Sequence, residues 1–426
     1  MTDATPDGLL VIGSSQAGVS LATSLRALGY DDPITLLGDE NHRPYQRPAL
    51  SKEWLQGEIT NESLMFRTQA YWDEHRIDVV KNERIVRIDK AADGSGTAHS
   101  LSGATFAFDR LALAVGARPR RLLLEGVDLP GVLYLRNADD ALELKARVPS
   151  VRDVVIIGGG FIGIEAAASL RKMGRTVTLL EAAPRLVPRA VGEETSAYLL
   201  DHHRAAGIDV VLGADVRRIV GRGDRVGGVE LADGRVVAAD LVLVGVGVIP
   251  NTELAESIGL VCDNGVRVDE SAIASDGVTV AVGDCANQPN PVPGAPEGDR
   301  VRFESVNNAI EQAKVAAYAI TGRREEYAGI PWFWSNQGQL KLQIAGLSSG
   351  HDRTLVRAEP DRGRHSVLYY RGDRLLAADC INHPLDFMAV RSALSKGLAI
   401  PHDDAADPAV ALKSVTVDPA ALVAAE

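Results

Sequence analysis

The chain has 426 residues, of which 46% are hydrophobic and 24% charged, a composition typical of a soluble globular protein. Because one hydrophobic core usually stops growing before this length, we expect two or three domains. The net charge of −12 argues against general nucleic-acid binding, which needs a basic face, but leaves room for a small basic patch that binds an acidic protein.

Neither a leader nor a membrane anchor is indicated. Met1 to Gly8 carries Asp3 and Asp7 and no basic segment, unlike a signal peptide. The longest strongly apolar run, 241–249, is far too short to span a bilayer. We therefore expect a cytoplasmic protein.

The first predicted unit lies close to the N-terminus. An apolar strand at 9–12 is followed by the turn GSSQAG at 13–18, by an apolar-periodic helix that Gly29 ends, and by a strand at 34–37. Strand, glycine-rich turn, helix and strand form a βαβ unit, the context in which such a turn binds a dinucleotide. A bare structural bend is the alternative.

The same pattern returns later in the chain. A strand at 154–157 precedes the turn GGGFIG at 158–163, a helix that Gly174 ends, and a strand at 177–181. Continuous apolar strands are typical of a parallel sheet covered on both faces. The repeat therefore predicts two nucleotide-binding domains.

Further strands are expected to complete these domains. Three apolar segments that reach a glycine are predicted strands: 111–116, 241–247 and 278–284. Beyond Pro331, alternating strands at 367–370 and 375–378 flank a Gly372-Asp373 turn and predict a small α+β domain. A helix is predicted at 385–394, and the tail after Pro401 is expected to lie loosely on the surface.

The two turns differ in their glycines. In G-x-G-x-x-G the second glycine lets the backbone approach a pyrophosphate, and the helix N-terminus attracts that anion. GGGFIG keeps all three, Gly158, Gly160 and Gly163, whereas GSSQAG has Ser15 in the second place. We expect the first turn to approach its phosphates differently.

An acid after each second strand is expected to bind ribose hydroxyls. Glu181 ends its strand and favours NADH, because a carboxylate repels a 2′-phosphate; Arg185 is the one feature that softens this preference. In the first unit the strand-end position is Gly38. Asp39 is then the preferred ribose ligand, with Glu40 as the alternative.

Several motifs in fixed order carry a resemblance. They are GSSQAG, PYQRPALSK at 44–52, GGGFIG with Glu165, Gly283-Asp284-Cys285, ESVN at 304–307 and PWFWS at 331–335. The chain resembles the FAD-dependent, NADH-linked ferredoxin reductases of bacterial oxygenase systems.

This resemblance implies an α/β, glutathione-reductase-like fold with two Rossmann-like dinucleotide-binding domains and a C-terminal α+β domain. The implied FAD domain is 1–117 with 249–328, the NADH domain 118–248, and the C-terminal domain 329–426. Departures from the family pattern are Ser15, Val115 and Gly338.

The resemblance also implies the site residues. Lys52 is the cation beside flavin N5, and Glu165 pairs with it and helps to place the nicotinamide; a surface lysine and an ordinary helix glutamate are the alternative. Implied FAD contacts are Gly13, Ser15, Ala17, Gly18, Asp39, Lys52, Ile85, Arg136, Gly283, Asp284, Val306 and Trp334. Implied NADH contacts are Gly158, Gly160, Ile162, Gly163, Glu181 and Gly247.

A helix capped by Ser305 is expected to direct its positive N-terminus at the flavin. Its outward residues are predicted to be Asn308, Glu311 and Lys314, and its inward ones Ala309, Ile310, Ala313, Ala316 and Ala317. The alternative is a helix that serves the core alone. Likewise, Trp334 either shields the flavin or, with Trp332, fills a domain interface.

One FAD per chain is expected to convert the hydride of NADH into single electrons for a [2Fe–2S] ferredoxin that feeds a mono- or dioxygenase. Lys314, then Lys341 and Arg302, are candidate cations for an acidic ferredoxin; solvated surface charges are the alternative.

The cysteines bear on rival functions of the same fold. Disulfide and peroxide reductases need a redox cysteine early in the chain, but Cys262, Cys285 and Cys380 are the only ones here and stand far apart. Cys285 is interpreted as a buried small residue. A flavin NADH oxidase and a slow redox-sensing flavoprotein remain alternatives.

Overall fold

The computed structural model describes residues 7–292, 295–327 and 329–420 and divides into two compact units. Unit 1 consists of residues 1–47, 60–118 and 248–329, and unit 2 of 48–59, 119–247 and 330–426. The segment 48–59, expected in the FAD domain, is grouped with unit 2 because its Leu55 is buried in the same core as Leu170 and Leu342.

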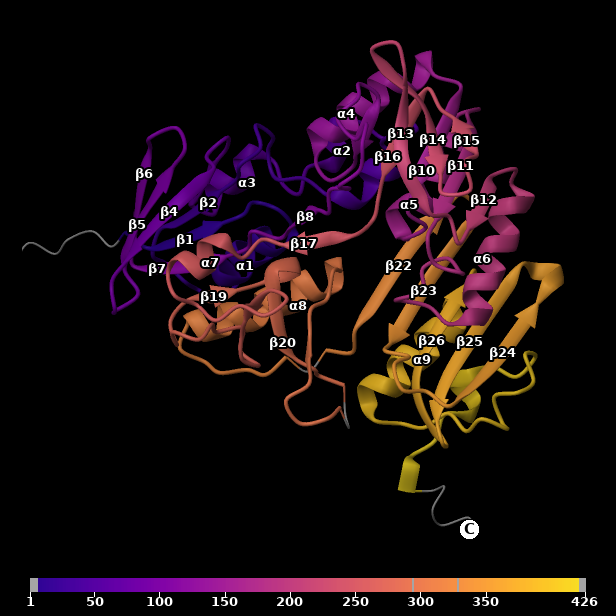
Figure 1. Cartoon of the computed structure of the whole chain (residues 1–426). Helices are drawn as coiled ribbons and strands as arrows, with labels where there is room; N and C mark the ends of the chain where they lie inside the picture. Colours follow the sequence, from indigo (N-terminus) through magenta and orange to yellow (C-terminus); the bar gives the residue numbers. More distant parts are fainter. Residues whose placement is uncertain (1–6, 293–294, 328, 421–426) are drawn as a thin grey trace, which may run out of the picture. The chain divides into compact units, whose positions relative to one another are not determined.

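Unit 1 contains a five-stranded parallel sheet with α1 (Gln16–Ala27) and α8 (Val306–Ile320) packed on one face (Figure 1). Leu21 and Leu25 of α1 share a core with Ala313 of α8, whose small side chain permits close approach of the helices. The strands, in sheet order, are β19 (Val280–Ala281), β7 (Arg110–Leu113), β1 (Leu9–Ile12), β2 (Ile34–Leu37) and β3 (Ile77–Val80).

A second core of unit 1 joins this sheet to a three-stranded antiparallel sheet of β4 (Ile85–Lys90), β5 (Gly96–Ser100) and β6 (Thr105–Phe108). Phe108 of β6 packs with Leu111 of β7 in that core. Further elements of unit 1 include α2 (Asn61–Leu64), α3 (Gln69–Glu74), α7 (Glu253–Ser257), β17 (Val248–Pro250), β18 (Val266–Arg267), η3 (Gly283–Cys285), β20 (Ala286–Pro289) and β21 (Arg300–Val301).

Unit 2 repeats the first architecture. Its five parallel strands, in sheet order, are β12 (Asp209–Leu212), β11 (Thr176–Glu181), β10 (Asp153–Ile157), β16 (Leu241–Val244) and β9 (Val132–Tyr134). Its helices are α4 (Ala138–Arg147), α5 (Phe161–Lys172) and α6 (Glu193–Ala205), and a three-stranded sheet follows as β13 (Val216–Arg222), β14 (Arg225–Leu231) and β15 (Val236–Ala238). Both predicted βαβ units are confirmed, and with them the predicted fold class.

The C-terminal part of unit 2 is an antiparallel sheet with α9 (Pro384–Lys396) beside it (Figure 1). The strands, in sheet order, are β22 (Trp332–Gln337), β23 (Leu340–Gly346), β26 (Arg374–Ile381), β25 (Arg364–Arg371) and β24 (Arg353–Glu359). The predicted hairpin and helix are thereby confirmed. Leu342 and Ile381 of this sheet share one core with Leu170 and Leu179, so the segments predicted as NADH and C-terminal domains form one compact unit.

The described part of the tail is packed, which corrects the expectation of a loose segment. Ile400, Ala405 and Leu412 are buried in the core around α9. The buried Arg357 guanidinium donates to the carbonyl oxygens of Asp407 (2.9 Å) and Val410 (2.7 Å). A buried cation that satisfies several carbonyls holds this Ala- and Asp-rich chain in place.

Candidate functional site

The first glycine-rich turn fits tightly between β1 and β7. Gly13 has φ +116°, and a Cβ there would lie 2.1 Å from the carbonyl oxygen of Ala114. A Cβ on Gly18 would lie 1.9 Å from the carbonyl oxygen of Gly13. Both positions therefore require glycine, and the N-terminus of α1 begins directly at the turn.

Ser15, the departure from the usual pattern, links this turn to a distant segment. It is the N-cap residue of α1, and its hydroxyl accepts a hydrogen bond from Arg47 Nε at 3.1 Å. Arg47 also pairs with Glu40, whose carboxylate accepts from the Tyr45 hydroxyl at 2.6 Å. Because Glu40 is engaged in this network while Asp39 is exposed, the geometry supports Asp39 as the ribose ligand.

The displaced acid of the first unit has a steric explanation. In unit 2 the Glu181 carboxylate accepts from the backbone N–H of Gly159 at 2.5 Å and of Ala183 at 2.7 Å. At the matching place in unit 1, a Cβ on Gly38 would lie 2.2 Å from Ser14 Oγ. The serine of the first turn thus occupies the room that the second turn leaves for its acid.

A second segment of unit 1 meets the start of α1. A Cβ on Gly283 would lie 2.8 Å from Ala17 Cβ, so Gly283 and Asp284 pass close to the predicted flavin-contacting Ala17. The N–H of Gly283 donates to Oε1 of the buried Gln312 at 2.7 Å, and Gln312 Nε2 donates to Gln288 Oε1 at 2.6 Å. Sequence reasoning missed Gln312, a buried polar residue of α8 that belongs to none of the motifs.

The helix that follows Ser305 begins as predicted, with Ala313 and Ala316 buried and Lys314 exposed, but one residue predicted to lie outward lies inward. Ser305 Oγ accepts from the N–H of Asn308 at 3.1 Å, and Val306 is the first residue of α8. Asn308 is 1% exposed and donates to Gln312 Oε1 at 3.2 Å, so its predicted outward position is wrong. An amide can lie inward here because buried amides partner it.

Ile85 lies beside the second strand of unit 1. The N–H of Glu83 donates to the carbonyl of Gly38 at 2.9 Å, which places the segment next to Asp39. The Ile85 side chain is buried in the core with Ile12 and Leu37, whose strands lead into the predicted FAD contacts.

The second turn leaves room for a ligand. A Cβ on Gly160 would meet no atom within 4 Å, and this N-cap residue of α5 has no side chain to occupy the first N–H groups of the helix. A Cβ on Gly158 would lie 2.3 Å from the carbonyl oxygen of Gly245, so the loop that holds Gly247 borders the turn, while Ile162 is 43% exposed. An open cradle at a helix N-terminus fits a dinucleotide pyrophosphate.

Lys52 and Glu165 form a buried ion pair in unit 2. Lys52 Nζ lies 2.9 Å from Glu165 Oε1, and the two residues are 7% and 3% exposed. Glu165 also accepts from Ser51 Oγ (2.8 Å) and Ser335 Oγ (2.7 Å). Burial contradicts the alternative of a surface lysine, and the buried carboxylate has three donors as partners.

Aromatic residues follow along β22. The Trp334 and Trp332 ring centroids are 5.5 Å apart, and Phe333 packs against Phe161 of the second turn at 4.5 Å. The hairpin after β22 turns at Gly338 with φ +64°, a left-handed conformation that explains glycine where the family has an aromatic residue. Arg136, also in unit 2, donates its N–H to Asp140 Oδ2 at 2.8 Å immediately before α4.

The candidate partner-binding cations differ in exposure. Lys314 is about half exposed and pairs with Glu311 at 2.8 Å, and Lys341 is exposed. The Arg302 side chain is only 8% exposed, and it donates to the carbonyl oxygen of Asp284 at 3.0 Å and pairs with Glu304. This geometry favours a structural role for Arg302 at the Asp284 turn.

The cysteines show no sign of redox chemistry. Cys285 is fully buried, and burial raises the pKa of its thiol to about 11. Cys380 is buried as well, and Cys262 is also a free thiol. Such thiols stay protonated and are poor nucleophiles. Among the described residues, no cluster of metal-ligating side chains occurs.

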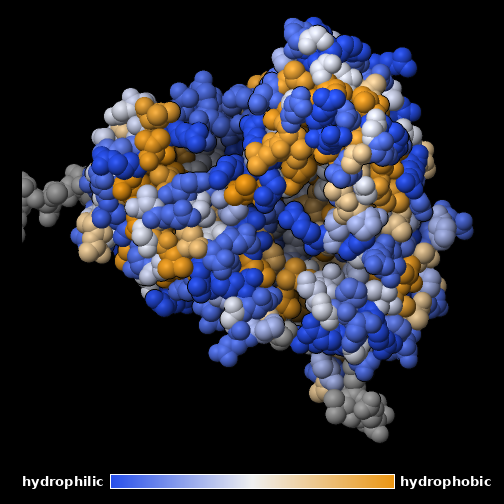
Figure 2. Space-filling view, in the orientation of Figure 1, coloured by the Kyte–Doolittle hydropathy of each residue, from blue (hydrophilic) through white to orange (hydrophobic). Residues whose placement is uncertain are grey.

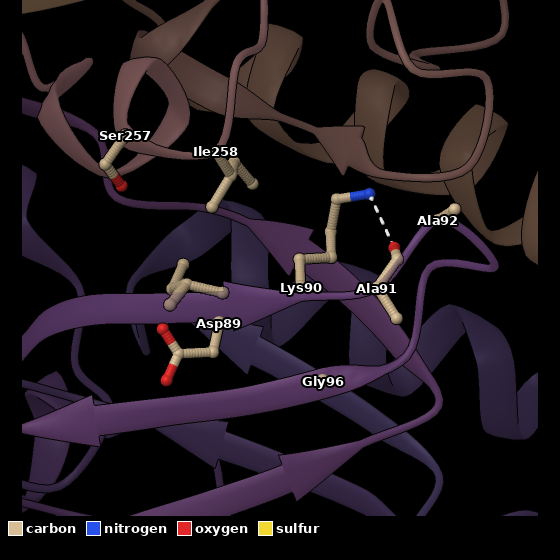
Figure 3. A pocket seen from close by; sticks show the side chains of 8 residues that line it. Asp89, Lys90, Ala91, Ala92, Gly96, Ser257 and Ile258 are labelled. Carbon is tan, nitrogen blue, oxygen red and sulfur yellow. Dashed lines mark hydrogen bonds between the residues drawn. The ribbon is translucent and has the colours of Figure 1, made fainter.

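The surface adds little to this picture. The face drawn in Figure 2 is largely hydrophilic with scattered apolar patches. A shallow pocket of unit 1 lies where Ser257 and Ile258 face Asp89 and Lys90 of β4 (Figure 3), and no predicted site residue lines it. Within residues 7–292, 295–327 and 329–420, no helix is long and apolar enough to cross a membrane.

Comparisons with known proteins cover most of the chain. The pyridine nucleotide-disulphide oxidoreductase family matches residues 8–313, and the reductase C-terminal family matches 332–416. Rhodocoxin reductase of Rhodococcus erythropolis is 42% identical over 94% of this chain and 92% of its own length. The 5,5'-dehydrodivanillate O-demethylase ferredoxin reductase subunit of Sphingobium sp. is 38% identical, over 96% and 98%. The solved covalent putidaredoxin reductase–putidaredoxin complex matches with a TM-score of 0.91 and 35% identity, over 99% of this chain and 100% of that one.

Proposed function

The chain belongs to the pyridine nucleotide-disulphide oxidoreductase family, and from that premise we propose that it is an FAD-dependent oxidoreductase that takes hydride from NADH and passes single electrons to a [2Fe–2S] ferredoxin. The relatives reported above confirm the resemblance to ferredoxin reductases of oxygenase systems. A downstream mono- or dioxygenase consumes the electrons. We further propose that this protein works in the cytoplasm, where NADH is supplied.

The buried ion pair of Lys52 and Glu165 is the observation that carries this proposal. Both residues lie in unit 2 with the second glycine-rich turn, and Glu165 is in the first turns of α5. Bound FAD supplies the conversion of a hydride into single electrons. Lys52 provides a fixed positive charge for the group that receives the hydride, and Glu165 holds that charge in place.

The proposed cofactor contacts are those that the resemblance implies. In unit 1 the first turn, Asp39 and the Gly283-Asp284 turn would hold FAD, together with Ile85 and Val306. In unit 2 the residues proposed for FAD are Lys52, Arg136 and Trp334, and the second turn, Glu181 and Gly247 would hold NADH. The absence of a cysteine before Cys262 supports an outward path for the electrons.

The ferredoxin is proposed to bind through cations. Lys314 and Lys341 are exposed lysines that can attract an acidic electron carrier, which accelerates association more than it tightens binding. Arg302 is retained as a residue that supports the Asp284 turn.

One experiment tests the proposal against its alternatives. The purified holoenzyme is mixed with NADH in the presence or absence of a [2Fe–2S] ferredoxin coupled to cytochrome c. We expect rapid cytochrome reduction only with ferredoxin. Rapid oxygen consumption without ferredoxin would instead indicate an NADH oxidase, and slow turnover with a stable long-wavelength band would indicate a redox sensor.

Coenzyme choice is expected to depend on Glu181. Replacing Glu181 by Ala removes the charged acceptor proposed for the ribose hydroxyls of NADH. It also removes the charge that repels the 2′-phosphate of NADPH. We expect the KM for NADH to rise about 10- to 100-fold, from a loss of about 1.5–3 kcal/mol, while the KM for NADPH changes much less. Steady-state kinetics with both coenzymes measure this. The exposed Glu193→Ala variant is the control, and an unchanged preference for NADH would contradict the assignment.

A further inference from the structure

Glu165 is the end of a chain of buried hydrogen bonds that begins on another helix. His203 Nε2 of α6 lies 2.9 Å from Gln337 Oε1, Gln337 Nε2 lies 3.1 Å from Ser335 Oγ, and Ser335 Oγ lies 2.7 Å from Glu165 Oε1. The exposed fractions of His203, Gln337, Ser335 and Glu165 are 2%, 1%, 0% and 3%. All of these residues belong to unit 2.

The direction of this chain of hydrogen bonds follows from which of its atoms can donate and which can accept. Gln337 Oε1 can only accept, so His203 Nε2 must carry the proton and donate it. Gln337 Nε2 then donates to Ser335 Oγ, which leaves the Ser335 hydroxyl proton for Glu165. Every donor therefore points toward the carboxylate that pairs with Lys52.

The reverse arrangement is unfavourable. If the Gln337 amide turned around, its oxygen would require the Ser335 proton, and Glu165 would lose a donor in a buried site. An unsatisfied buried acceptor costs free energy, more so when it is charged. The donor on His203 at one end and the need of Glu165 for a donor at the other therefore favour the same orientation of the amide.

From this geometry we propose that His203 is a positioning residue for the hydride-transfer step, acting through Gln337 and Ser335 to fix the Glu165 carboxylate and thereby Lys52. The inference rests on the proposed function of the Lys52–Glu165 pair. His203 and Gln337 are 134 positions apart in the sequence, and neither residue belongs to a predicted dinucleotide-binding turn.

The electrostatics of His203 agree with this role. Burial lowers the pKa of its imidazole, and the hydrogen bond to Gln337 opposes that shift without reversing it. The ring is therefore neutral at pH 7, and a neutral ring has one N–H to place. The chain of hydrogen bonds to Glu165 requires that proton on Nε2.

The first test observes the proton directly. Long-range ¹H–¹⁵N NMR of the purified holoenzyme, with the His203 signals assigned by their loss in His203→Leu, reports the tautomer. We expect a neutral, Nε2-protonated ring at pH 7. A Nδ1-protonated ring would overturn the proposal, because such a ring cannot donate to Gln337. This measurement uses no electron acceptor and is independent of the proposed function.

The second test measures hydride transfer from NADH to the flavin by stopped flow. We expect His203→Leu to slow it about 10- to 100-fold, as expected for a small misplacement of reacting groups. His203→Gln keeps a donor at the Nε2 position and should restore the rate to within a few-fold of wild type. His202→Leu, on the same helix, is the matched control.

A double-mutant cycle separates this role from a general loss of packing. Ser335→Ala should slow the step as much as His203→Leu does, and the double variant should be no slower than Ser335→Ala. Multiplicative effects, or an unchanged rate in Ser335→Ala, would overturn the proposal. A holoenzyme with normal hydride transfer that fails to reduce ferredoxin would count against the proposed function and leave this inference standing.

Discussion

Replacing Lys52 by Met is expected to slow the reduction of the flavin by NADH about 100- to 1,000-fold, the usual cost of removing one fixed donor that stabilises developing charge. The side chains of Lys and Met are similar in length, so the variant removes the ammonium and keeps most of the packing. Stopped-flow absorbance of the flavin at saturating NADH measures the rate. An unchanged rate would remove Lys52 from the reaction.

Stability must be separated from chemistry in that experiment. Lys52→Met leaves Glu165 as a buried carboxylate without its cation, which costs about 3–5 kcal/mol for an ion pair of this kind. The double variant Lys52→Met/Glu165→Gln relieves the unpaired charge and should recover much of the free energy of unfolding without recovering the rate. Lys172→Met, which removes an exposed lysine, is the control for both quantities.

The local parts of the fold could be predicted from the sequence because their causes are local. Apolar strands that lead into glycine-rich turns specify both βαβ units, and Ser305 caps its helix through an atom three residues away. The pairing of Lys52 with Glu165 was predicted from motifs of a family, since nothing in the spacing of two residues so far apart indicates contact.

The rest depends on contacts between distant segments. Asn308 lies inward because Gln312 and Gln288 form a buried amide network there, and hydrophobic periodicity predicts polar residues outward. The tail is held by Arg357, which comes from β24 and binds carbonyl groups that carry no sequence signal. His203 was missed for the same reason: a lone histidine on a helix shows its role only when Gln337 is seen beside it.

A buried acid in the C-terminal sheet predicts how stability depends on pH. Asp379 of β26 is 1% exposed, and its Oδ2 accepts from the Tyr369 hydroxyl at 2.5 Å and from the N–H of Gly192 at 3.4 Å. Its Oδ1 has no hydrogen-bond partner among the described residues. Burial is the main cause that raises the pKa of this carboxyl to about 6, and the hydrogen bonds oppose the shift.

The sign of the effect follows from the raised pKa. Below pH 3.8, the pKa of Asp379 in the unfolded chain, both the folded and the unfolded state hold the proton. Asp379 then takes nothing from the free energy of unfolding. As pH rises from there through about 6, the unfolded chain releases its proton more readily, so the free energy of unfolding falls and then stays constant. The loss between pH 4.5 and 8 should be about 2 kcal/mol.

Asp379→Asn should abolish that loss. The Asn oxygen can still accept from Tyr369, whereas its NH₂ takes the place of the unpartnered Oδ1 and costs about 1–3 kcal/mol at every pH. We therefore expect the variant to be less stable than wild type at pH 4.5 and to recover about 2 kcal/mol relative to it by pH 8. Urea unfolding at several pH values measures the difference, with the exposed Asp361→Asn as the control. Parallel stability curves for wild type and Asp379→Asn would show that Asp379 is ionised in the folded protein throughout, held by Tyr369 and the N-terminus of α6 more strongly than burial opposes it.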